Sequence, residues 1–291
     1  MSAATLAVAT LRPGQEVTGT FACARKDRLV SRSGAPYLAM ELRDRTGTIS
    51  ARAFRDADVL SGRFERGDVV RVAGRVERFR DELVLEARAI ARVAPDEVDP
   101  AAFLPVAYRD LDELDGFLEH LAGEVTDAGF AALLRGLLGD DALRVEWRRA
   151  PCTRGGHHAY LGGLLEHTVA VATLALEACT LHPRLEKDLL LTAALVHDLG
   201  KTREFTYGAE IGLTEEGRLL GHVELGLRLL ERAGASVLDD TRRVALAHCV
   251  LCHHGPDAAP GRRFGSPEAL ALFRLNALDA SVKDALEHGL R

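Results

Sequence analysis

The sequence has few of the features that would take it out of the class of ordinary globular proteins. Its five cysteines are odd in number and irregularly spaced, so they provide no disulfide framework. No apolar run reaches the roughly 20 residues that a membrane-spanning helix needs. Residues 1–17 lack the basic and apolar regions of a secretory signal, and internal repeats and low-complexity tracts are missing. We therefore expect a cytoplasmic protein without a membrane partner.

The composition is sufficient for a well-buried core. With 291 residues, 47% apolar and 27% charged, the chain is long enough for one large domain or two ordinary ones. Charge is unevenly distributed: residues 1–95 carry 17 Lys and Arg against 12 Asp and Glu, whereas the remainder carries 20 against 31. A mildly basic first part suits a polyanionic partner. An arginine-rich solvated surface gives the same balance, so charge alone does not decide.

The segment 16–93 has the period of β-strands. Apolar and polar residues alternate over 37–43, a turn follows at 44–47, and 48–54 reads as the return strand. Two further strands are indicated at 69–76 and 83–91, with a turn at 80–81. Short strands joined by turns, without a long helix, predict a small closed or partly open β-barrel.

Beyond Pro95 the period becomes helical. A linker at 96–105 contains proline and acidic residues, and after it apolar residues recur at helix spacing. Ser266-Pro267-Glu268 is a typical helix start, with a capping hydroxyl, a proline at the first position and an acid after it. The expected helices are 111–125, 130–138, 161–179, 185–199, 215–233, 241–253 and 267–288. The fold class is therefore multidomain, β followed by α.

Histidines and aspartates are distributed over successive predicted helices. A helical bundle can bring such side chains to one interior point, and imidazole and carboxylate suit divalent manganese, iron, cobalt and zinc. Asp198, beside His197, is the natural candidate to bridge two ions, because an imidazole does not readily bind two. One helical histidine is more often a core or surface residue, but a set on successive helices rarely arises by chance. The expected metal ligands are His167, His197, Asp198, His222, His253, His254 and Asp279.

The order of these residues resembles the HD phosphohydrolase superfamily, which is named for its His-Asp pair. His167, the pair His197-Asp198 and Asp279 match the family's pattern, and residues 195–201 are similar to the helix end that carries the pair. Further segments resemble the YhaM-type 3′–5′ exoribonuclease family, which joins an N-terminal OB-fold to a C-terminal HD domain. They are residues 156–158, 162–167, 219–222, 253–255 and 265–267. One departure is Ser281, where members of the family commonly carry a lysine.

The resemblance implies a domain organisation and a cofactor. A five-stranded OB-like barrel is expected over 1–95, a linker and helical lead-in over 96–150, and an all-α HD helical bundle over 151–291. Two divalent ions share Asp198: His167, His197 and Asp279 complete one ligand set, and the three remaining histidines complete the other. Manganese is the expected metal, with iron, cobalt, zinc and magnesium as alternatives.

The catalytic residues expected from the same resemblance are Asp198, Lys201, His157 and His158. Lys201 stands where the superfamily often has a phosphate-contacting lysine. Its alternative role is that of a cation favoured by a helix C-terminus. His157 and His158 either contact the substrate phosphate or protonate the leaving oxygen, and their alternative role is in structural hydrogen bonds of their loop. The expected reaction is hydrolysis of a phosphodiester by water activated between two metal ions.

The barrel is expected to hold single-stranded nucleic acid in a basic groove, with bases stacked on aromatic rings. The candidates are Tyr37, Arg43, Arg52, Phe54, Arg78, Phe79 and Arg80. Strand alternation places about half of such residues inside a barrel, and we assign each aromatic to the core rather than to the binding face. The preference for RNA over DNA and the 3′–5′ direction follow from the resemblance alone.

Two other functions fit the same sequence. One is an HD-type nucleotide phosphohydrolase or small-nucleotide phosphodiesterase whose barrel serves in assembly. The other is a nucleic-acid-binding protein with an inactive HD domain, against which the intact ligand set argues. A homo-oligomer is left open.

Overall fold

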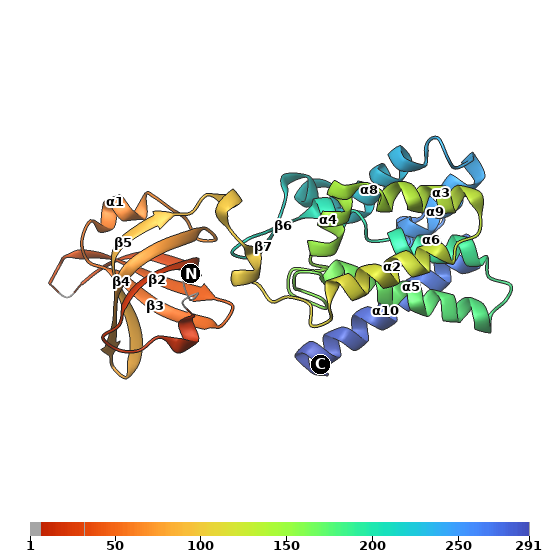
Figure 1. Cartoon of the computed structure of the whole chain (residues 1–291). Helices are drawn as coiled ribbons and strands as arrows, with labels where there is room; N and C mark the ends of the chain where they lie inside the picture. Colours follow the sequence, from red (N-terminus) through yellow and green to blue (C-terminus); the bar gives the residue numbers. More distant parts are fainter. Residues whose placement is uncertain (1–6, 32, 291) are drawn as a thin grey trace. The chain divides into compact units, whose positions relative to one another are not determined.

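The computed structural model describes residues 7–31 and 33–290, and the chain divides into two compact units (Figure 1). The first unit comprises Met1–Pro105 together with the short segment Tyr207–Ile211. The second comprises Val106–Thr206 and Gly212–Arg291. Each unit has its own fold and is described separately.

The first unit is a closed five-stranded β-barrel with strand order β1-β2-β3-β5-β4, drawn in red and orange in Figure 1. β1 pairs with β4 through its first half and with β2 through its second half. A register shift between Cys23 and Arg25 lies where the strand passes from one partner to the other. The strands are β1 (Glu16–Val30), β2 (Pro36–Asp44), β3 (Gly47–Ala53), β4 (Val69–Phe79) and β5 (Glu82–Arg92), with one short helix, α1 (Ala57–Ser61).

The barrel core follows from the alternation in the sequence. On β2, Leu38, Met40 and Leu42 are buried, and on β3 every second residue from Ile49 to Ala53 is buried opposite them. The side chain of Asp44 accepts hydrogen bonds from the backbone N–H groups at 46 and 47, which closes the predicted turn. The apolar period of two therefore forms the inner wall of the barrel, as the sequence predicts.

The second unit is a helical bundle. The chain also forms a two-stranded hairpin that the sequence analysis did not predict, and the residues Tyr207–Ile211 of this hairpin belong to the first unit. The hairpin joins β6 (Phe205–Tyr207) to β7 (Ile211–Leu213). Helix α10 has the predicted bounds, and the hydroxyl of Ser266 accepts from Ala269 N at its start. The helices are α2 (Leu111–Gly123), α3 (Ala128–Leu138), α4 (Asp141–Arg149), α5 (Gly163–Leu181), α6 (Lys187–Val196), α7 (Lys201–Glu204), α8 (Glu215–Gly234), α9 (Asp240–Leu251) and α10 (Pro267–His288).

Helices α5 and α6 form the centre of this unit. From Leu189 to Val196 every residue of α6 is buried. α5 is long and apolar enough, by length and composition alone, to cross a membrane, although the sequence analysis found no run of that length. Half of that segment is buried inside the protein. α5 is thus a core helix of the bundle, and it carries His167 into the interior.

Candidate metal centre

Five histidines and one aspartate meet where four helices of the second unit approach one another. His167 projects from α5, and His222 follows a kink in α8. His197 and Asp198 are the first two residues beyond α6, and His253 and His254 follow α9 after Cys252. His197, Asp198 and His253 were predicted to lie within these helices. His167, His197 and His253 are fully buried, and Asp198 is 2% exposed. The structure thus brings together all the predicted histidine ligands.

The carboxylate of Asp198 lies between two groups of histidines. Its Oδ2 atom is 3.5 Å from His167 Nε2 and 3.4 Å from His197 Nε2. Its Oδ1 atom is 3.5 Å from His222 Nε2 and 3.5 Å from His253 Nε2. His254 joins the second group, with Nε2 2.9 Å from Nε2 of His222. One carboxylate therefore offers one oxygen to each group, as a ligand that bridges two cations does.

Four of the imidazoles turn Nε2 toward Asp198 and hold Nδ1 against an oxygen of the protein. A metal-binding histidine commonly has this arrangement, because the hydrogen bond at one ring nitrogen sets the tautomer and orientation of the other. The anchors are backbone carbonyls for His197 and His253, and carboxylates for His167 and His222. The pairs are His197 with Ala194 O at 2.8 Å, His253 with Val250 O at 2.6 Å, His167 with Asp279 at 2.6 Å and His222 with Glu204 at 3.3 Å.

The residues of this cluster fit divalent cations. Asp198 Oδ1 and His253 Nε2 are buried polar atoms that have no hydrogen-bond partner among the described residues, an arrangement that is costly unless a cation satisfies them. Burial lowers the pKa of both His167 and His253, which favours the neutral rings that bind metal. Burial would raise the pKa of Asp198, but Lys201 and His197 outweigh it and hold that pKa well below its usual value.

Lys201 lies in the interior beside the bridging carboxylate. Its side chain is 6% exposed, and Nζ is 2.7 Å from Asp198 Oδ2 and 3.3 Å from the sulfur of Cys152. Because its ammonium is paired with Asp198, the lysine contacts the ligand directly and is more than a cation at a helix end. Burial raises the pKa of the Cys152 thiol. The sequence analysis did not single out Cys152, whose neighbours become apparent only in the fold.

His157 and His158 lie next to His167 in the loop before α5. His158 is 1% exposed, its backbone is in the left-handed region at φ 52°, and its Nδ1 is 3.2 Å from Nδ1 of His157. Burial lowers the pKa of both rings, that of His158 to about 3. The backbone carbonyls of both are hydrogen-bonded, to Thr153 and Cys152. The loop hydrogen bonds are therefore present, and His157 is the more exposed of the two.

The two ring nitrogens of His167 face two different residues of α10. Asp279 Oδ2 lies 2.6 Å from Nδ1, on the side away from Asp198. Asn276 Oδ1 lies 3.0 Å from Nε2, on the same side as Asp198 and His197. Asn276 is buried and was missed by the sequence analysis, which searched for histidines and acids. Ser281, the departure noted above, is exposed.

The position of His222 is determined by Gly200, Gly221 and Glu204. Gly221 has φ 70°, a conformation that favours glycine, and it produces the kink in α8. A Cβ on Gly200 would lie 1.9 Å from the backbone oxygen of His222, so only glycine lets the segment after Asp198 approach α8. Glu204 accepts from the backbone N–H of His222 at 3.2 Å and also lies against its ring. Glu204 is a second site residue that sequence reasoning missed.

Six of the seven predicted nucleic-acid contacts lie on the surface of the barrel or at its rim. The rings of Tyr37 and Phe54 lie 5.4 Å apart, and the guanidinium of Arg52 lies 4.4 Å from the ring centre of Phe79. Phe54 is 52% exposed and Phe79 is 44% exposed, so the assignment of these two rings to the core is wrong. Arg78 and Arg80 are also exposed.

Arg43 is the exception among these candidates. It is half-buried, and its guanidinium donates to the carbonyl of Ala209 within the first unit. A groove of about 240 Å³ runs over the outer face of β1, β2 and β3. Its lining includes Arg25, Tyr37 and Arg52 but not Arg43. Tyr37 and Arg52 are also half-buried, but they line this groove, so of the seven candidates we leave only Arg43 out of the proposed binding surface.

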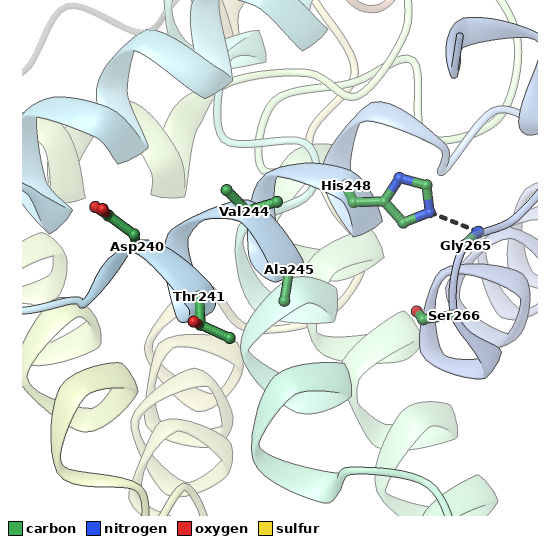
Figure 2. A pocket seen from close by; sticks show the side chains of 7 residues that line it. All are labelled: Asp240, Thr241, Val244, Ala245, His248, Gly265 and Ser266. Carbon is green, nitrogen blue, oxygen red and sulfur yellow. Dashed lines mark hydrogen bonds between the residues drawn. The ribbon is translucent and has the colours of Figure 1, made fainter. Parts of the chain in front are cut away.

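A separate surface pocket of about 610 Å³ lies over α9 and the start of α10, and Figure 2 shows its lining. His248 accepts a hydrogen bond from Gly265 N at 2.8 Å there (Figure 2). None of the metal-centre residues lines this pocket. The hydrogen bond fixes the start of α10, the helix that carries Asn276 and Asp279.

Comparisons with known proteins agree with this architecture. The model of the HD domain family matches residues 164–288, and that of an OB-fold nucleic acid binding domain matches residues 22–92. The chain is 27% identical to the 3′-5′ exoribonuclease YhaM of Bacillus subtilis (strain 168), and 28% identical to that of Bacillus velezensis. Each similarity covers 92% of this chain and 86% of the relative.

Part of the chain is similar to a solved structure, that of a small single-stranded DNA-binding protein from Streptomyces coelicolor. The sequence identity is 20% and the TM-score is 0.25. That match covers 28% of this chain and 95% of the other. The family models and the curated relatives confirm the resemblance and the fold class that the motifs indicated: an OB-like barrel followed by a helical HD domain.

Proposed function

Because the chain joins an OB-fold nucleic-acid-binding domain to an HD domain, we propose that it is a divalent-metal-dependent 3′–5′ exoribonuclease acting on single-stranded RNA. The observation that carries the proposal is the position of Asp198, with one oxygen toward each of two groups of histidines. The preference for RNA and the direction of attack rest on the activity for which the YhaM relatives are named.

The proposed cofactor is a pair of manganese ions, which imidazole and carboxylate ligands suit. Iron, cobalt, zinc and magnesium are the alternatives. When bound, such ions lower the pKa of a water molecule and offset charge on phosphoryl oxygens. His167, His197 and Asp198 would hold one ion, with Asp279, whose Oδ2 lies 2.6 Å from Nδ1 of His167, as the fourth residue of that set. The residues for the other would be Asp198, His222, His253 and His254.

The chain's own residues would prepare the site for this chemistry. The ammonium of Lys201 holds Asp198 in its ionised form and in one orientation. The anchored Nδ1 atoms keep the Nε2 lone pairs of four histidines aimed inward. His157, the more exposed histidine of the loop before α5, is the proposed contact for the substrate phosphate, and His158 supports it from the interior.

The barrel would hold the single strand by stacking and charge. Half-buried Tyr37 and exposed Phe54 form one aromatic pair, and Phe79 with Arg52 forms a second flat surface. Bases stack on aromatic rings with little regard to sequence, and arginines contact the phosphates. This arrangement favours a polymeric substrate over a mononucleotide.

The test uses the full chain, stripped of metal and resupplied with manganese. Single-stranded RNA and DNA labelled at the 5′ end, and a mononucleotide ester, are incubated with the protein and with its Asp198→Ala variant. His182→Ala serves as a matched control, because His182 is exposed and lies outside the cluster. The expected result is a metal-dependent ladder of RNA shortened from the 3′ end, retained in the control and lost in Asp198→Ala.

Other results would change the assignment. Turnover of the mononucleotide ester alone would replace the exonuclease by a nucleotide phosphohydrolase whose barrel has another task. Binding of RNA with no hydrolysis in any metal would leave a nucleic-acid-binding protein with an inactive HD domain. Equal shortening of RNA and DNA would retain the exonuclease and remove its preference for RNA.

A further inference from the structure

A second cavity of the barrel, of about 420 Å³, lies where α1 meets the outward side of β4 and β5. Strand register sets its floor, because Ala73 of β4 lies opposite Thr18 of β1 on one side and opposite Ala89 of β5 on the other. These three side chains are small, and each is at least partly exposed. The described lining shares no residue with the groove over β1, β2 and β3. The barrel therefore has two separate concave surfaces.

Positive charge predominates around this cavity. Arg71 pairs with Glu97 at 4.0 Å and Arg88 with Glu16 at 3.1 Å, and all four side chains are at least 60% exposed. Ion pairs at such exposure contribute little in water, so a phosphate can replace the glutamate. Arg63 is exposed and forms no ion pair within the part of the chain that the structure describes. The ionisable side chains of the lining are Arg63, Arg71, Arg88 and Asp56.

The rest of the lining indicates which part of a nucleic acid this cavity suits. Its described residues include no aromatic ring, and its apolar members are aliphatic, among them Val59 of α1, which is 56% exposed. Stacking of bases requires aromatic rings, whereas phosphates require positive charge and an open approach. The cavity therefore suits the sugar-phosphate backbone of a strand and not its bases.

We propose that this cavity is a second contact surface for single-stranded nucleic acid, at which Arg63, Arg71 and Arg88 bind phosphates of the strand. The proposed binding surface with its aromatic rings stacks bases, and the cavity adds contacts to the backbone. Residues 1–95 carry 17 Lys and Arg against 12 Asp and Glu, a balance that complements a polyanion. The inference rests on the nucleic-acid-binding part of the proposed function and is independent of the metal centre.

Two contact surfaces on one barrel make binding depend on the length of the strand. An OB-fold covers about 4–16 nucleotides, so a strand of about 5 nucleotides should engage the aromatic surface alone and one of about 20 should engage both. Each phosphate contact of a single strand contributes about 0.7 to the slope of log affinity against log salt concentration. Loss of one contact should therefore weaken binding of the long strand by about 5-fold at about 0.1 M salt.

The test measures binding of labelled oligouridylates of about 5 and about 20 nucleotides to the metal-free full chain, by fluorescence anisotropy at several salt concentrations. Arg63→Ala removes a charge without breaking an ion pair, and Arg63→Lys retains the charge. Arg184→Ala is the matched control, because it removes an exposed arginine of the second unit. Arg63→Ala should bind the long strand about 5-fold more weakly, with a slope smaller by about 0.7, and the short strand as wild type does. Arg63→Lys and Arg184→Ala should bind both strands as wild type does.

Ala89→Glu is an independent variant, which places a negative charge on the floor of the cavity and should also weaken binding of the long strand alone. Unchanged affinity and slope for the long strand in both Arg63→Ala and Ala89→Glu would overturn the proposal. An equal loss in Arg184→Ala would also overturn it, because overall charge would then explain the effect. Equal weakening of both strands in Arg63→Ala would reject a separate second surface. Wild-type protein that binds neither strand would reject the nucleic-acid-binding part of the proposed function itself, which is a different failure.

Discussion

Lys201 and Asp198 form a buried ion pair, with 2.7 Å between Nζ and Oδ2, on the carboxylate that both groups of histidines share. Breaking a buried pair by removing one partner leaves the other charge uncompensated, at a cost of about 3–5 kcal/mol. Two cations beside Asp198 would supply that compensation. The lysine and the metal therefore stabilise the same carboxylate.

Replacing this lysine should make stability depend on metal. In Lys201→Met the metal-free protein is expected to lose about 3 kcal/mol of unfolding free energy, and manganese should restore most of it. Urea unfolding with chelator and with manganese measures both values. As a matched control, Lys187→Met removes a half-exposed lysine of α6 that pairs with Glu124, and it should show no such dependence. An equal loss with and without metal would contradict the prediction.

Glu204 should control the affinity of the second ion. It anchors the ring of His222 and accepts from its backbone N–H, so Glu204→Ala frees the ring to rotate. Loss of such an outer partner typically weakens metal binding by about 10–100-fold. Manganese titration of Glu204→Ala is compared with Arg203→Ala, which changes an exposed neighbour. Wild-type affinity in Glu204→Ala would show that the kink at Gly221 positions His222 by itself.

The exposed aromatics should contribute to strand binding. Stacking on one aromatic side chain is worth about 1–3 kcal/mol per base, so Phe54→Ala should weaken binding of single-stranded RNA by about 5-fold or more. Fluorescence anisotropy on metal-free protein measures this without hydrolysis. Val59→Ala is the matched control, because Val59 is exposed to a similar extent on α1. Equal affinities of the two variants would remove Phe54 from the proposed binding surface.

The ionisation of Asp127 should make the free energy of unfolding depend on pH. Its side chain caps α3 through the backbone N–H groups at 129 and 130 and binds the guanidinium of Arg242. The hydrogen bond from Arg242 holds the pKa of Asp127 below its usual value. The pKa of Asp127 is lower in the folded protein than in the unfolded chain, where it is about 4. The stabilisation from its charge is therefore present above about pH 4 and is lost as the pH falls through the pKa of the folded protein.

Two variants separate the two tasks of Asp127. Asp127→Asn retains a capping side chain and removes the charge, so its stability should fall less than that of wild type between pH 5 and pH 3. Asp127→Ala should in addition lose about 1 kcal/mol for the cap. Urea unfolding at several pH values measures both effects. A pH profile of Asp127→Asn parallel to that of wild type would mean that other carboxylates cause the dependence.

Much of this architecture can be predicted because it depends on local patterns. The alternation from Leu38 to Leu42 specifies one face of a strand, and Ser266-Pro267 specifies the start of a helix with its observed bounds. The histidines were found because several residues of one type, on successive helices, are improbable without a common purpose. In each case the relevant property is carried by the residue type and the spacing.

Other residues depend on the fold and could not be found this way. Asn276 is an ordinary polar residue until the packing of α10 sets its amide between His167 and the carbonyl of His253. Phe54 was placed in the core because alternation puts about half of all strand residues inside a barrel, but it directly follows the buried Ala53 at the end of β3 and is exposed. The β6-β7 hairpin has strands of three residues, too short for a period to be recognised.

The closed order of the barrel limits how a partner can be bound. In an open sheet the outermost strands present unpaired backbone groups, and another chain can pair with them as an added strand. Here β1 pairs with both β2 and β4, so the described strands form a ring without an outermost member. Recognition by this barrel must therefore come from its side chains, and a change of partner would require changes in surface residues and not in strand register.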